Sequence, residues 1–99
     1  MATAQETKAK LLAETARCPF SELQRFFAQG SLLRVGVDLD LMDVGVALAM
    51  DDAATFQRWL EAGEVAPLED NLAEEWLAAD TELWTMVVRP WILVQPSRD

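Results

Sequence analysis

The sequence predicts a small α+β fold, in which a sheet of two or three strands packs against four to five helices. Segments whose apolar residues recur at helical spacing alternate with segments in which every second residue is apolar. The chain has 99 residues, of which 52% are apolar, and no Gly/Ser-rich linker or internal repeat divides it. We therefore expect a single domain over residues 1–99, with its core at 4–95 and a tail at 96–99.

The first predicted helix covers residues 4–17. Its apolar stripe has helical spacing and consists of Ala9, Leu12 and Ala16, with Leu11 beside them. Cys18 and Pro19 end this helix, because the residue before a proline avoids the α conformation.

A short second helix is predicted to begin at Ser21, with Gln24 in the return position of a capping box. Its apolar face consists of Leu23, Phe26 and Phe27. Gly30 suits the left-handed residue that commonly follows the end of a helix.

The most apolar helix is predicted to begin at Asp40, with Asp43 in the return position of another capping box. Residues 41–50 are apolar on nearly every side, which is typical of a helix buried on most sides. We expect this to be the central helix, and we expect Gly45 to mark a close contact within it.

Two further helices follow the central one. Asp51 and Asp52 end it and cap a helix over residues 53–62, which Gly63 ends. The last helix begins at Asn71 and runs to residue 79. The apolar positions of these two helices are Phe56, Trp59 and Leu60 in the first, and Leu72, Trp76 and Leu77 in the second. Glu74 completes a capping box with Asn71.

Three segments are predicted to be extended. Residues 31–37 form a strand, and residues 64–68 form a short strand or an extended connection in which Pro67 marks an edge or an end. In residues 31–37 one face carries Leu33, Val35 and Val37, and the other carries Leu32 and Arg34.

The third extended segment covers residues 83–95. Pro90 cannot donate a hydrogen bond to a sheet, so this segment is either one edge strand or two strands joined by a bulge, with a hairpin as a further arrangement. Read as one strand, its first face carries Trp84, Met86, Val88, Ile92 and Val94, and its second carries Thr85, Val87, Arg89, Trp91 and Leu93. We expect Trp91, beside Arg89, to form an interaction patch whose unpaired edge could pair with a second copy of the chain.

Charge is unevenly distributed along the chain. The net charge is −9, and residues 38–82 hold thirteen carboxylates against Arg58 alone. An acidic segment of this kind either keeps a small protein in solution or attracts a partner with a basic surface. It would repel nucleic-acid phosphates.

The compartment follows from what the chain lacks. No apolar run approaches the ~20 residues that span a bilayer, and the first ten residues lack the apolar stretch of a secretory signal. The single Cys18 cannot form an internal disulfide. We therefore expect a cytoplasmic protein without membrane contact.

Little in the sequence points to catalysis. Histidine and tyrosine are absent, the serines lie in no nucleophile motif, and the four glycines form no phosphate-binding loop. Cys18 has no neighbouring base. The pattern of Asp38, Asp40 and Asp43 fails the calcium-loop spacing at three positions. We therefore expect no catalytic residue, metal or cofactor.

Two alternatives stay open. A carboxylate- or metal-dependent enzyme could use Asp38, Asp40, Asp51 and Asp52, although helix capping also explains aspartates at such positions. A nucleic-acid-binding protein could use the two helices around Asp51 as a helix-turn-helix. The second of these helices would then present Thr55, Gln57 and Arg58 outward.

Several sequence blocks together resemble a known family. They are AKLLAETA, ELQRFFAQGSLLRV, DLDLMDVGVALAMDDAATFQRWLEAGEV and LWTMVVRPWILVQ, in this order. The set resembles domain of unknown function 2288, a family of small stand-alone bacterial proteins, over residues 8–95. The resemblance implies a bacterial cytosolic setting and no particular activity.

The function that we expect first is a non-catalytic protein-interaction module, whose partner has a basic surface or is a second copy of the chain. The candidate interaction residues are Asp38, Asp40, Asp51, Asp52, Arg58, Arg89 and Trp91.

Overall fold

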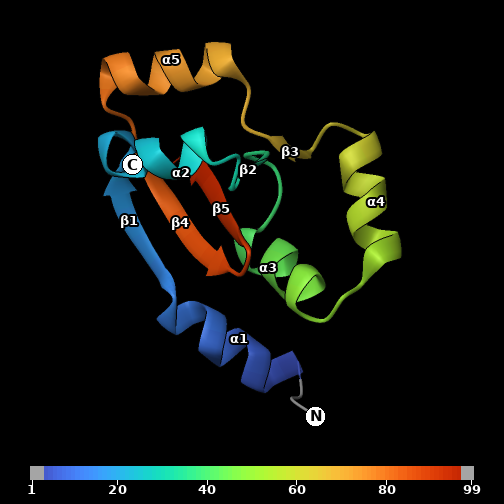
Figure 1. Ribbon diagram of the computed structural model, residues 1–99. Coiled ribbons are helices and arrows are strands. Elements are labelled where there is room, and N and C mark those ends of the chain that lie inside the picture. The colour runs from blue at the N-terminus through green and yellow to red at the C-terminus, as the bar shows by residue number, and fades with distance from the viewer. Residues whose placement is uncertain (1–3, 97–99) are drawn as a thin grey trace.

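Figure 1 shows the computed structural model of the chain, in which residues 4–96 are described. These residues form five α-helices, one short 3₁₀ helix and a sheet of five strands. The α+β class is therefore confirmed, whereas the prediction of two or three strands is wrong because the sheet is larger.

The helical elements are α1 (Ala4–Ala13), the 3₁₀ helix η1 (Phe20–Leu23), α2 (Gln24–Ala28), α3 (Leu41–Ala49), α4 (Ala53–Glu61) and α5 (Asp70–Ala79). The strands are β1 (Thr15–Pro19), β2 (Leu32–Val35), β3 (Val65–Pro67), β4 (Glu82–Val88) and β5 (Trp91–Pro96). The predicted tail begins at Pro96, which is instead the last residue of β5, and the rest of that tail lies outside the described residues.

The sheet is mixed, and its strand order is β1-β4-β5-β2-β3. The pairs β1–β4, β4–β5 and β2–β3 are antiparallel, whereas β2 and β5 are parallel, with Leu33 opposite Leu93. Parallel neighbours cannot be joined by a hairpin. The whole segment from α3 to β4 therefore lies between these two strands in the sequence.

The first predicted helix is too long, because β1 replaces its C-terminal part. In the antiparallel pair β1–β4, Arg17 lies opposite Trp84. Pairing with β4 satisfies the backbone groups of residues 15–19 that face β4 and outweighs their helical spacing. β1 is at the edge of the sheet, where Pro19 is tolerated. With Ala16 in a strand, the predicted stripe fails: Leu11 is buried, and Leu12 is 66% exposed.

Residues 82–96 form a hairpin whose two strands, β4 and β5, both lie inside the sheet. The interpretation of this segment as one edge strand is therefore wrong. Arg89 and Pro90 form the turn and are joined by a cis peptide bond. The turn reverses the chain and changes which residues share a face, since Met86 lies opposite Leu93 and Val88 opposite Trp91. β5 lies between β4 and β2, so Trp91 is not on an unpaired edge and cannot pair there with a second copy.

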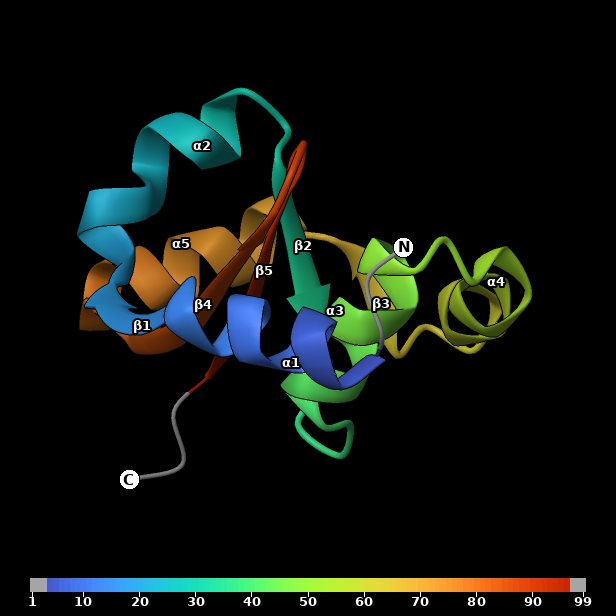
Figure 2. The same cartoon turned by 90° about the horizontal axis from the view of Figure 1, so that it is seen from below.

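Helices cover both faces of the sheet. Figure 2 shows α2 and α5 on one side of the central strands and α1 and α3 on the other, with α4 farther out beyond β3. The cluster beneath α1 and α3 consists of Leu11, Leu33, Val35, Leu41, Val44, Val65, Met86, Val88 and Leu93. The cluster beneath η1, α2 and α5 consists of Phe20, Leu23, Leu32, Leu68, Ala73, Trp76, Leu83, Ile92 and Val94. The alternation along β2 therefore serves both cores.

Two of the predicted caps are present. The Asp40 side chain accepts a hydrogen bond from the Met42 amide at 2.8 Å, and that of Asp52 accepts one from the Thr55 amide at 3.3 Å. Gly30 and Gly63 have positive φ angles, +73° and +74°, as their positions after helices predict.

None of the three predicted capping boxes is complete. Asp40 caps α3 through the Met42 amide, but among the described residues the Asp43 side chain accepts no return bond from the Asp40 amide. α2 continues directly from η1, so its first amides need no Ser21 side chain, and the Ser21 amide instead donates to Asp80. The N-cap of α5 is Glu69 rather than Asn71, without a side-chain capping bond. The Glu69 carboxylate accepts a hydrogen bond from Arg34.

Two residues that share a predicted apolar face with buried residues are themselves exposed. Val37 lies beyond the end of β2 and is 49% exposed. Leu77 is 44% exposed, because α5 turns Ala73 and Trp76 toward the sheet.

None of the described helices is both long enough and apolar enough to cross a bilayer.

Gly45 is a contact point between α3 and the sheet, as predicted. A Cβ atom at this position would overlap the Met86 sulfur and lie 3.2 Å from Leu11 Cδ1. Met86 and Leu11 are buried, so neither side chain has free space into which it could move.

We expect Gly45→Val to lower the free energy of unfolding by about 1–3 kcal/mol, because the added side chain overpacks the core. Ala49→Val is the matched control, since it places the same side chain at an exposed position of the same helix. It should cost less than about 0.7 kcal/mol. Denaturant unfolding measures both values, and equal losses would contradict the close contact at Gly45.

We expect Asp52→Ala to lower the free energy of unfolding by about 1 kcal/mol, because the Thr55 amide loses its acceptor. Glu75→Ala removes an exposed carboxylate from the interior of α5 and serves as the control. It should leave the midpoint of denaturant unfolding nearly unchanged. If both variants lose the same stability, loss of charge rather than loss of the cap explains the result.

Candidate interaction surface

The acidic segment 38–82 is open to solvent. All thirteen of its carboxylate residues are exposed. Among the described residues, two of them form ion pairs: Glu69 with Arg34 at 3.1 Å, and Glu82 with Arg17 at 3.3 Å. Most of the negative charge of this segment is therefore not neutralised within the described part of the chain.

The four candidate aspartates do not converge. Asp40 caps the start of α3, and Asp52 follows its end, so a nine-residue helix separates them. At 1.5 Å per residue, the ends of such a helix are about 14 Å apart. Asp38 lies with Asp40 and Asp51 with Asp52. Within residues 4–96, no group of three or more acidic or cysteine side chains is placed to hold a metal ion.

The remaining candidates lie in two other places. Arg58 is on α4, whereas Arg89 is in the β4–β5 turn and Trp91 begins β5. Arg89 and Trp91 line a shallow hollow of about 320 Å³ with Phe26 and Pro90. Trp91 is half-buried against the core beneath α1 and α3. The seven candidates therefore do not form one site.

The outward side chains of α4 bond mainly to one another. The Thr55 hydroxyl donates to Asp52 at 2.8 Å, Arg58 donates to that hydroxyl at 3.4 Å, and Gln57 donates to Glu61 at 3.3 Å. The helix-turn-helix interpretation requires these groups to face a nucleic acid. It stays a prediction, and no further feature of the described surface favours it.

A different feature gathers acidic and apolar residues from distant parts of the chain. A hollow of about 460 Å³ lies at the carboxyl ends of the parallel strands β2 and β5. We call it the Asp38–Glu64 hollow. Its lining includes Arg34, Asp38, Glu64, Leu72, Trp76 and Pro96.

The turn over residues 36–39 forms one wall of the Asp38–Glu64 hollow and is held at several points. The Leu39 amide donates to the Gly36 carbonyl at 3.1 Å. The Gln95 side-chain amide donates to the carbonyls of Gly36 and Leu39, each at 2.8 Å. The Gly36 amide donates to the Glu64 carbonyl at 2.7 Å. These bonds fix the backbone that carries Asp38 beside that of Glu64.

Gly36 allows this approach of two backbones. A Cβ atom at this position would lie 3.1 Å from the Glu64 carbonyl oxygen, which is closer than most such contacts. A larger residue would push the turn away from Glu64, so the small size of Gly36 determines how near the two walls lie.

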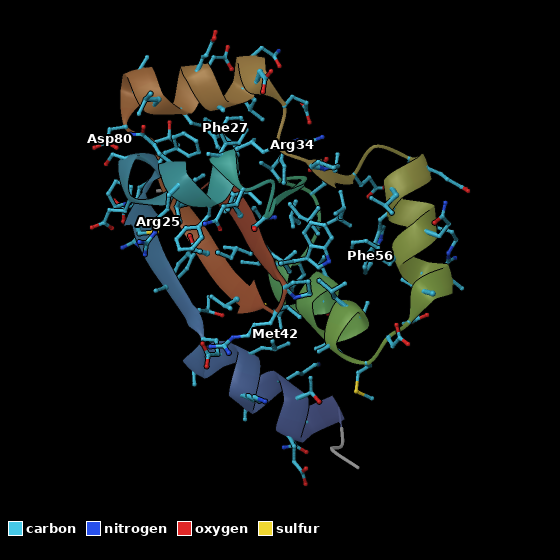
Figure 3. The ribbon with its side chains drawn as sticks, viewed as in Figure 1. Arg25, Phe27, Arg34, Met42, Phe56 and Asp80 are labelled. Carbon is cyan, nitrogen blue, oxygen red and sulfur yellow. The ribbon has the colours of Figure 1, made fainter. Side chains whose placement is uncertain are left out.

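Among the described residues that line the Asp38–Glu64 hollow, Arg34 is the one cation, and it already has partners. Its Nε donates to Glu69 at 3.1 Å, and its guanidinium also donates to the Gly63 carbonyl at 3.4 Å. Figure 3 shows Arg34 directed from β2 toward the connection that precedes α5. Asp38 and Glu64 have no side-chain hydrogen bond or ion pair among the described residues.

A larger hollow, of about 660 Å³, lies beneath α1. Its charged lining residues are Glu6, Lys10, Glu14 and Arg89. Charges of both signs line it in equal number, so it favours no sign of ligand charge. These charged residues also lie outside the acidic segment.

Sequence reasoning found Asp38 but missed the other parts of the Asp38–Glu64 hollow. Trp76 was predicted to be a core residue, which it is, at 6% exposure, while it also lines the hollow. Gln95 and Glu64 carry no sequence signal for this role. The position of Gln95 depends on the parallel pairing of β2 with β5, and that of Glu64 on the antiparallel pairing of β2 with β3; hydrophobic periodicity predicts neither pairing.

Comparisons with known proteins support one family. Residues 6–96 match the family described as Protein of unknown function (DUF2288). The chain is also similar to PA1075 from Pseudomonas aeruginosa, whose NMR solution structure is 40% identical in sequence, with a TM-score of 0.82. That match covers 100% of this chain and 89% of the other. The comparison with curated proteins found no match. The resemblance inferred from the sequence blocks agrees with the family match.

We expect Gln95→Ala to lower the free energy of unfolding by about 1–3 kcal/mol, because the Gly36 and Leu39 carbonyls each lose the hydrogen bond from Gln95. The Leu39 amide should also exchange its hydrogen faster, since the turn loses its clamp. Gln57→Ala removes an exposed side chain of α4 and serves as the control. Unchanged hydrogen exchange at Leu39 in Gln95→Ala would contradict the clamp.

Proposed function

The chain belongs to the DUF2288 family of proteins of unknown function, and we propose that it is a non-catalytic protein-interaction module. In this proposal the acidic segment 38–82 binds a partner protein that has a basic surface. The cytoplasm of a bacterium is the setting that we propose for it.

One observation carries the proposal: the exposed carboxylates of residues 38–82 largely lack cationic partners among the described residues. With Arg58 as its one basic residue, the segment carries a formal charge of −12. Carboxylates of like sign raise the free energy of the isolated protein by mutual repulsion. A basic partner would relieve this repulsion and would be attracted over a distance of about 8 Å at physiological salt.

The residue types also support a non-catalytic role. The chain contains no histidine or tyrosine, and so it lacks the side chain that most often transfers protons near neutral pH. The same negative charge that would attract a basic protein would repel nucleic-acid phosphates. A protein partner therefore fits this surface better than a nucleic acid does.

Charge reversal in the acidic segment tests the proposal. We expect Glu61→Lys/Glu75→Lys to weaken capture of a stoichiometric partner from a bacterial lysate at least tenfold, because the attraction becomes repulsion. Salt at about 1 M should weaken capture by the unchanged protein, since the attraction between exposed charges is then screened beyond about 3 Å. Capture is quantified by mass spectrometry.

Glu14→Lys/Glu22→Lys is the matched control, since it makes the same change of charge outside residues 38–82. Both control positions are exposed, and this variant should retain most of the capture. If no stoichiometric partner is recovered at low salt and the protein sediments as a strict monomer, the proposed function is wrong.

A further inference from the structure

We propose that the Asp38–Glu64 hollow receives the side chain of a lysine or arginine residue of the basic partner. This inference rests on the proposed function and names the docking point within it. Three features of the hollow carry it: apolar walls, two carboxylates that have no side-chain partner among the described residues, and a backbone that is already held in place.

The walls suit the stem of a basic side chain. Leu72 and Trp76 of α5 and Pro96 of β5 contribute apolar surface to the Asp38–Glu64 hollow. Lysine and arginine side chains place their methylene groups against apolar surface while the charged group stays near water or a carboxylate. A hollow of about 460 Å³ has space for one such side chain.

The charges of the Asp38–Glu64 hollow select a cation. Arg34 is paired with Glu69 and therefore does not neutralise Asp38 or Glu64. These two carboxylates lack side-chain partners among the described residues, and both are exposed. An ammonium or guanidinium group that enters would form charge-assisted hydrogen bonds with them, whereas an anion would be repelled.

The backbone around the Asp38–Glu64 hollow needs little rearrangement on binding. Gln95 holds the turn that carries Asp38, and Gly36 bonds that turn to the Glu64 carbonyl. The Glu64 amide in turn donates to the Trp59 carbonyl at 2.9 Å. Because these bonds exist before binding, less conformational entropy is lost when the site binds the partner's side chain.

Titration with short peptides, followed by NMR of the ¹⁵N-labelled protein, tests the inference. The probes are N-acetyl, C-amide Gly-Lys-Gly and Gly-Arg-Gly, and the neutral control is the norleucine peptide of the same length. We expect the basic probes to shift the amide signals of Val37, Asp38 and Glu64 and the indole signal of Trp76. The norleucine peptide should shift them much less.

Two neutralised variants separate the Asp38–Glu64 hollow from the general charge of the surface. Asp38→Asn/Glu64→Gln should weaken binding of the lysine and arginine probes at least tenfold. Asp43→Asn/Glu75→Gln removes the same charge elsewhere in the acidic segment and should weaken it less than threefold. Equal weakening in both variants, or signal shifts spread over all the carboxylates, would overturn the inference.

The outcome also distinguishes this inference from the proposed function. If a basic partner is captured and Asp38→Asn/Glu64→Gln captures it equally well, the hollow is not the docking point and the proposed function stands. If no basic protein is captured, both fail. If the same variant converts a dimer in solution to a monomer, a second copy of this chain occupies the hollow, and the inference is wrong.

Discussion

The parallel pairing of β2 with β5 joins the N-terminal and C-terminal halves of the described chain. β1 and β4 lie on one side of this pair, and β3 lies on the other. The register sets Leu33 opposite Leu93 and thereby aligns the carboxyl ends of the two strands. Because of this alignment, the Gln95 side chain reaches the turn that follows β2. The Asp38–Glu64 hollow depends on this alignment and on the antiparallel pairing of β2 with β3, since its walls come from β2 and the turn after it, the residues before β3, α5 and the end of β5.

Burial and charge act in opposite directions in this small protein. The two buried clusters stabilise the sheet from both faces, at roughly 25 cal/mol for each Å² of apolar surface removed from water. The net charge of −9 opposes the compact state by repulsion between carboxylates. Some carboxylates also stabilise local structure: Asp40 and Asp52 cap helices, and Glu69 pairs with Arg34. Asp38 and Glu64 make no comparable side-chain contact within the described chain, so they are free to interact with a partner.

Sequence patterns predicted correctly those features that depend on only a few neighbouring residues. The Asp40 and Asp52 caps and the positive φ angles of Gly30 and Gly63 follow from backbone geometry at helix ends. β1 was missed because its residues carry helical spacing, while the backbone groups that make it a strand belong to β4. The faces of the hairpin were misassigned, since a two-residue turn at Arg89 and Pro90 changes which residues lie together. Trp91 was consequently placed on an edge that does not exist.

The sequence by itself determined the α+β class, the helix that follows Asp40, the close contact at Gly45 and the acidic character of residues 38–82. These properties depend on residue type and on spacing along a single element, which periodicity and composition record. Only the tertiary structure decided the strand order, the number of strands and the position of Asp38 and Glu64 around one hollow. These depend on which backbone groups pair across long stretches of sequence, and such pairing is set by the packing of the whole chain rather than by any local preference.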